Sequence, residues 1–147
     1  MKEKKVCFAG HRYIWQNSGV EDKLKEILIK VINDGYTTFY CSNMGYFDKL
    51  CIDTLFNLKA IYKHIKIFKI LTYYHENKEK WDISKSYSGS LMPEIEQYYP
   101  KARITKKNEW LVDSCDLLIC HIIETYKSGA YNTVKYAIKK NKDIIYV

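Results

Sequence analysis

Residues 116–122 contain an almost continuous apolar run, Asp-Leu-Leu-Ile-Cys-His-Ile, which constrains the fold of this chain more than any other segment. A strand exposed on one face alternates apolar and polar side chains, and this segment does not. It is therefore predicted to be a central strand of a parallel sheet, covered on both faces by other elements. Residues 4–9 are apolar from Val6 to Ala9 and are predicted to form another buried strand, which ends at Gly10.

Segments with helical and strand character alternate along the rest of the chain. A helix is predicted from Ser18 or Gly19 to Asp34-Gly35, because apolar residues recur there at three- and four-residue steps and glycine commonly follows a helix. Similar patterns predict strands at 37–41, 65–71 and 143–147, and helices at 46–62 and 129–140. The alternation predicts one α/β domain over residues 1–147, with a mostly parallel sheet of about five strands covered by helices on both faces.

The segment between residues 72 and 90 interrupts this alternation with aromatic and charged residues. Short helices are predicted at 77–81 and 91–98, and Pro100 is predicted to end the second, because proline breaks a helix interior. A further helix of one to two turns is predicted at 108–114. Long insertions of this kind are commonly functional.

The chain carries a net charge of +7, from 24 Lys and Arg residues against 17 Asp and Glu residues. Lysine supplies most of the positive charge and is spread along the sequence, which favours a solvated surface over a nucleic-acid interface. No apolar run approaches membrane-spanning length, and no signal peptide follows the charged N-terminus. We therefore expect a soluble, cytoplasmic protein that does not contact a membrane.

The cysteines indicate a reduced interior. Their number is odd, no CxxC spacing occurs, and most lie in or beside apolar runs. Neither the cysteines nor the histidines have the spacing of zinc ligands, so no metal and no cofactor are predicted. The five residues are Cys7, Cys41, Cys51, Cys115 and Cys120.

Three loops are predicted at the carboxyl edge of the sheet, where open parallel sheets bind ligands. They follow the first, second and fourth predicted strands and comprise residues 10–12, 42–48 and 124–133. Glycines in these loops allow backbone N–H groups to approach a ligand, and helix N-termini favour anions. Each loop alone is typical of an ordinary turn, but together they predict a site for an anionic small molecule. Its candidate residues are Gly10, His11, Arg12, Ser42, Asn43, Met44, Gly45, Tyr46, Asp48, Glu124, Ser128, Gly129, Ala130, Asn132 and Thr133.

Four side chains in these loops have the chemistry for ligand contact. Arg12 offers a planar fork of donors suited to phosphate or carboxylate. His11 has the chemistry of a general acid or base, but donation to a ligand phosphate or to the backbone is favoured here. Asp48 is equally consistent with stabilising the N-terminus of its helix and with contacting a ligand hydroxyl. Glu124 can reach the same pocket, yet no nucleophile–base set accompanies it, so no catalytic residue is predicted.

Four segments resemble, in this order along the chain, the YpsA-like branch of the SLOG superfamily, which is named after the DprA (Smf) and LOG proteins. They are residues 8–12, 42–48, 107–116 and 128–137. Gly-His-Arg in the first segment and Gly-Tyr-Phe-Asp in the second are the more specific elements. The resemblance implies a Rossmann-like fold with a nucleotide-binding pocket over the strand edge, and it implies a homodimer.

The chain departs from the family pattern at several of these positions. Cys41-Ser42 and Ser128-Gly129 stand where the family has pairs of glycines. Lys107 stands where it has the arginine before Asn108, and both residues are carried over as ligand-binding candidates, although lysine loses the bidentate geometry of arginine. LOG-type hydrolases carry a glutamate shortly after their glycines, whereas residues 131–135 contain no carboxylate. The resemblance therefore implies binding rather than hydrolysis.

The preferred hypothesis is a protein that senses or sequesters a nucleotide-derived ligand, such as ADP-ribose or a cyclic ADP-ribose-type signal made from NAD. Sequestration of an immune nucleotide signal by a phage-encoded protein is one form of this hypothesis. A LOG-like phosphoribohydrolase that uses Glu124 is the first alternative. DprA-like nucleic-acid binding ranks last, because no single element is seen to concentrate Lys and Arg. Trp110 is expected in the core, with base stacking and subunit anchoring as alternatives.

Overall fold

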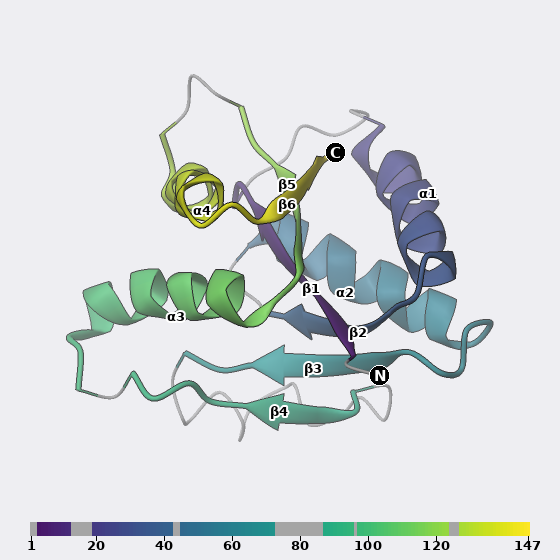
Figure 1. Cartoon of the computed structure of the whole chain (residues 1–147), viewed down its shortest axis with the longest axis horizontal. Coiled ribbons are helices and arrows are strands. Elements are labelled where there is room, and N and C mark those ends of the chain that lie inside the picture. The colour runs from purple at the N-terminus through teal and green to yellow at the C-terminus, as the bar shows by residue number, and fades with distance from the viewer. Residues whose placement is uncertain (1–2, 13–18, 43–44, 73–86, 96, 124–126) are drawn as a thin grey trace.

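A computed structural model describes residues 3–12, 19–42, 45–72, 87–95, 97–123 and 127–147 (Figure 1). Within these residues, six strands form one sheet in the order β4-β3-β2-β1-β5-β6, and every neighbouring pair is parallel. The predicted α/β fold is confirmed, with one strand more than the five expected. The strands are β1 Lys4–Gly10, β2 Tyr36–Cys41, β3 Lys66–Ile70, β4 Gly89–Leu91, β5 Leu117–His121 and β6 Asp143–Tyr146.

Helices cover both faces of this sheet and give the molecule three layers (Figure 1). α1 (Val20–Asn33) and α2 (Tyr46–Lys59) pack on one face. α3 (Pro100–Ser114) and α4 (Gly129–Lys139) pack on the other. In the described part of the chain, no helix is both long enough and apolar enough to cross a lipid bilayer.

β1 and β5 are neighbouring interior strands of the sheet and are buried on both faces. Val6 and Phe8 of β1 face α1 and α2, whereas Cys7 and Ala9 pack on the side of α3 and α4. In β5, residues 117–120 are each at most 4% exposed. The prediction of a central strand from the apolar run at 116–122 is therefore confirmed, and the five cysteines are buried as predicted.

The segment before α3 differs from the prediction. None of the described residues in 91–98 is helical, because Gly89–Leu91 pair with β3 instead and form the edge strand β4. Pro100 does not end a helix but begins α3. The first N–H groups of a helix have no intrahelical acceptor, so a proline, which lacks the N–H, is tolerated at this position. α3 consequently has 15 residues and extends well beyond the predicted 108–114. The helix predicted at 77–81 lies outside the described residues.

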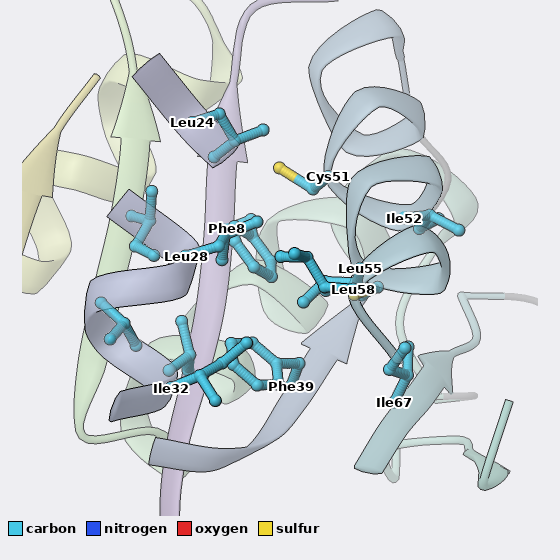
Figure 2. Packing of buried hydrophobic residues seen from close by; sticks show 14 of the residues in the cluster. Phe8, Leu24, Leu28, Ile32, Phe39, Cys51, Ile52, Leu55, Leu58 and Ile67 are labelled. Carbon is cyan, nitrogen blue, oxygen red and sulfur yellow. The ribbon is translucent and has the colours of Figure 1, made fainter. Parts of the chain in front are cut away.

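The core between the sheet and the α1–α2 layer consists mainly of large apolar side chains (Figure 2). Leu28 of α1 and Leu55 of α2 lie on either side of Phe8, and both leucines are fully buried. Removal of this apolar surface from water is the main force that holds the helix layer to the sheet.

Replacing Leu28 with alanine is expected to lower the free energy of unfolding by about 2–5 kcal/mol, because a cavity replaces buried methyl groups. Urea unfolding followed by circular dichroism measures this change. Lys25→Ala is the matched control, since Lys25 lies on the same helix and is exposed. Equal losses in the two variants would contradict the packing described for α1.

Candidate functional site

The strand order reverses between β1 and β5, so the carboxyl ends of these two strands form the switch point of the sheet. β1 leads into the α1–α2 layer, whereas the neighbouring strand β5 leads into α4 on the opposite face. The loops that leave these two strands therefore diverge, and ligands in open α/β sheets bind at such switch points.

The imidazole of His11 links the two diverging loops. Its Nδ1 lies 2.8 Å from the Oγ of Ser128, at the start of α4. Its Nε2 accepts a hydrogen bond of 2.6 Å from the backbone N–H of Ile123, just after β5. The backbone N–H of His11 also donates to the carbonyl of His121 at 3.3 Å. With its side chain only 4% exposed, His11 is an internal clamp between the loops.

The hydrogen bonds of His11 define its protonation state. Nε2 accepts an N–H and must be unprotonated, so Nδ1 carries the proton and donates to Ser128. Burial lowers the pKa of His11, and the nearby His121 lowers it further. Both observations indicate a neutral imidazole at neutral pH. A neutral, doubly engaged ring positions other groups and is poorly suited to proton transfer.

Ser128 presents a hydroxyl group at the N-terminus of α4. Its Oγ accepts one hydrogen bond from the Nδ1–H of His11 and a second, of 3.3 Å, from the backbone N–H of Tyr131. A hydroxyl with both acceptor positions occupied retains one hydrogen to donate. That donor lies beside the first N–H groups of α4, which begins at the exposed Gly129. The arrangement favours an anion through the hydroxyl, the free N–H groups and the helix dipole.

Close packing joins the β1 loop to the β2–α2 loop. The backbone N–H of Tyr46 donates to the carbonyl of Arg12 at 2.8 Å. A Cβ on Gly45 would lie 2.7 Å from the Cα of Arg12, and a Cβ on Gly10 would lie 2.3 Å from the Phe47 ring. At both positions, only glycine leaves room for the neighbouring residue. We call the contact formed by Gly10–Arg12, Gly45, Tyr46 and Ser128 the three-loop junction; Arg12 and Tyr46 are exposed at it.

Asp48 is held by a partner in its own loop. Ser42, which is buried, donates its hydroxyl to Oδ2 of Asp48 at 3.2 Å, and Asp48 lies in the first turn of α2. This contact closes the β2–α2 loop and places a negative charge at a helix N-terminus, where it is stabilising. Contact between Asp48 and a ligand hydroxyl remains a prediction.

A groove of about 320 Å³ lies between α3 and α4, which we call the α3–α4 groove. Tyr136 of α4 ties the two helices together, because its hydroxyl donates to both carboxylate oxygens of Asp113 at 2.9 and 3.0 Å. The predicted candidates that line the groove are Asn108, Gly129, Asn132 and Thr133. Gly129 therefore belongs to the groove and also follows the Ser128 of the three-loop junction directly.

The structure divides the predicted ligand-binding residues into groups. Gly10, His11, Arg12, Gly45, Tyr46 and Ser128 meet at the three-loop junction, and Ala130 follows in the first turn of α4. Asn108, Gly129, Asn132 and Thr133 line the α3–α4 groove, and Ser42 pairs with Asp48. Asn43, Met44 and Glu124 lie outside the described residues.

Lys107 and Trp110 lie on the side of α3 that packs against the sheet. Lys107 is completely buried and does not line the α3–α4 groove. It precedes the buried Leu111 by four residues, which places both on the same face of the helix. Trp110 stacks on Tyr40 of β2, with ring centres 5.7 Å apart and an interplanar angle of 9°. Trp110 is half-buried and packs against the core, so the expected core position is met in part.

Several groups at the site were not among the candidates predicted from the sequence. The backbone N–H of Ile123 holds His11, and any residue type except proline would supply it. Glu109, Lys135, Tyr136 and Lys139 also line the α3–α4 groove. In α4, polar residues recur at three- and four-residue steps, and this spacing could have indicated that they share one face of the helix.

Comparisons with known proteins establish the fold and leave the family open. No protein-family model matches the chain, and no curated protein matches it in sequence. Among solved structures, the Chlamydomonas rheinhardtii Moco carrier protein superposes on it with a TM-score of 0.59 at 9% sequence identity. The match covers 99% of this chain and 76% of that chain. At this identity the similarity concerns the Rossmann-like α/β architecture alone.

Replacing Gly10 with alanine is expected to lower the free energy of unfolding by about 1–3 kcal/mol, because the added Cβ overlaps the buried Phe47 ring. Gly129→Ala is the matched control, since a Cβ there meets nothing within 4 Å. Denaturant unfolding of both variants measures the difference. Unchanged stability of the Gly10 variant would show that the loop does not pack as described.

The neutral state of His11 predicts a pH dependence of folding. The folded pKa lies below the ordinary value of 6.5, so the unfolded chain binds the proton more readily. The free energy of unfolding should therefore decrease as the pH falls below about 6.5, and the free energy of unfolding of the His11→Gln variant should decrease less steeply. Urea titrations at several pH values measure both slopes. Identical slopes would contradict the neutral, buried imidazole.

Proposed function

We propose that this protein binds a nucleotide-derived small molecule at the three-loop junction. The observation that supports this most directly is the His11 clamp, which holds the Ser128 hydroxyl at the N-terminus of α4 beside the switch point. In this proposal the ligand phosphate accepts hydrogen bonds from Ser128 and from the first N–H groups of α4. Arg12 is the cation that pairs with it.

ADP-ribose, or a cyclic ADP-ribose-type signal made from NAD, is the ligand class that we favour. The resemblance of the four loop and helix segments to the YpsA-like branch of the SLOG superfamily supports this choice. We further propose that the protein senses or sequesters such a ligand, as a homodimer in the cytoplasm. The solved structure that shares this fold is named as a carrier protein for Moco, and a carrier role is in keeping with binding.

Binding is favoured over hydrolysis by the way in which His11 is used. An imidazole can transfer protons near neutral pH. In the three-loop junction, however, both nitrogens of His11 form hydrogen bonds that hold the two loops together. Glu124, on which the hydrolytic alternative depends, lies outside the described residues.

Arg12→Ala is expected to abolish ligand binding and to leave the fold intact, because Arg12 is exposed and its backbone makes the contact to Tyr46. Thermal unfolding with ADP-ribose, cyclic ADP-ribose, NAD, AMP and Moco measures this effect. At a ligand concentration about 100 times Kd, the wild-type protein should gain about 2.7 kcal/mol of stability.

Lys63→Ala is the control for the loss of one positive charge, since Lys63 is exposed in the segment that leads from α2 into β3. It should retain the full stabilisation. The proposal fails if no ligand of the panel raises the melting temperature of the wild-type protein at millimolar concentration. Unchanged affinity of the Arg12 variant would place the site elsewhere, and release of free base from AMP would favour the hydrolase.

A further inference from the structure

The α3–α4 groove continues the three-loop junction along α4. Gly129 follows Ser128 directly and lines the groove, so the groove reaches the N-terminus of α4. Asn108 and Asn132 also line the groove and carry amide groups, and Ile104 adds apolar surface. A groove with apolar surface and a few polar groups is the usual form of a small-molecule site.

The far part of the groove is positively charged. Lys135 and Lys139 lie four residues apart on one face of α4, and both line it. Neither forms an ion pair with a carboxylate in the described part of the chain. The carboxylate that lines the groove, Glu109, is itself paired with Lys106 at 3.4 Å.

The sequence around α4 reinforces this charge. Residues 125–142 contain five lysines and no aspartate or glutamate. The groove therefore attracts anions along its α4 wall, whereas α3 supplies the polar and apolar groups of the opposite wall.

The spacing along α4 sets the size of a ligand that uses both ends. At about 1.5 Å per residue, Lys135 lies about 9 Å and Lys139 about 15 Å further along the helix than Gly129. A nucleoside monophosphate has one anionic group and cannot occupy both ends. A ligand with two phosphate-bearing groups separated by a sugar can do so.

We infer that the α3–α4 groove binds a second phosphate group of the ligand, through Lys135 and Lys139. The ligand class is a nucleotide with a phosphate at the α4 N-terminus and another on a sugar that lies in the groove, such as ADP-ribose phosphorylated at a ribose hydroxyl. This inference rests on the proposed function, because it takes the first phosphate to lie at the three-loop junction.

Isothermal titration calorimetry with ADP-ribose and its 2′-phosphorylated form tests the inference, because the two ligands differ only in the second phosphate. The wild-type protein should bind the phosphorylated form about tenfold more tightly. The double variant Lys135→Gln/Lys139→Gln should lose this preference and keep its affinity for ADP-ribose. Its melting temperature without ligand should equal that of the wild type, since both lysines are exposed.

Lys23→Gln/Lys25→Gln is the matched control. It removes the same charge from exposed positions on α1, on the opposite face of the sheet, and should keep the preference. Equal loss in the two double variants would indicate a general effect of net charge and would overturn the inference.

The remaining outcomes separate this inference from the proposed function. If all variants bind the two ligands equally, the second phosphate subsite is wrong and the proposed function stands. If neither ligand binds the wild-type protein, both fail. Tight binding of a short single-stranded oligonucleotide that depends on Lys135 and Lys139, without a preference between the two ligands, would assign this face to nucleic acid and overturn the subsite.

Discussion

The hydrogen bonds of one buried imidazole determine how the candidate site is assembled. β1 and β5 are neighbours in the sheet, but their loops diverge to opposite helix layers, and His11 joins those loops through Ser128 and Ile123. A charged imidazole would carry a proton on Nε2 and would oppose the N–H of Ile123. The contact with Ile123 therefore depends on a neutral His11, whereas Nδ1 donates to Ser128 in either protonation state.

The central part of the fold could be predicted because burial on both faces leaves a clear pattern. β1 and β5 contain continuous apolar runs, and such runs fit a parallel sheet between two helix layers. The periphery carried weaker signals. β4 has three residues, too few for any periodicity to be read. Pro100 was ambiguous, since proline both ends helices and begins them, and the first half of α3 has few apolar residues to reveal a helical period.

The candidate site was predictable to the extent that topology decides it. Loops at the carboxyl ends of parallel strands share one edge of the sheet, so the approach of Gly10–Arg12 to Gly45 and to Ser128 follows from the strand order. Contacts made by backbone atoms could not be read, because the N–H of Ile123 and the carbonyl of Arg12 carry no residue identity. The placement of Lys107 could have been read, since it stands one helical turn before Leu111 on the buried face of α3.

The hydrogen bonds of the titratable side chains support the proposed binding function. A general acid or base needs a titratable group that can reach the reacting atoms and change its protonation state near the working pH. His11 has the right chemistry, but its nitrogens serve the two loops and burial lowers its pKa. The hydroxyl of Tyr136, which lines the α3–α4 groove, is engaged with Asp113, and burial raises the pKa of Tyr136 to about 12. Titratable groups that lock two elements together keep a binding surface rigid, and a preorganised surface lowers the entropic cost of holding a ligand.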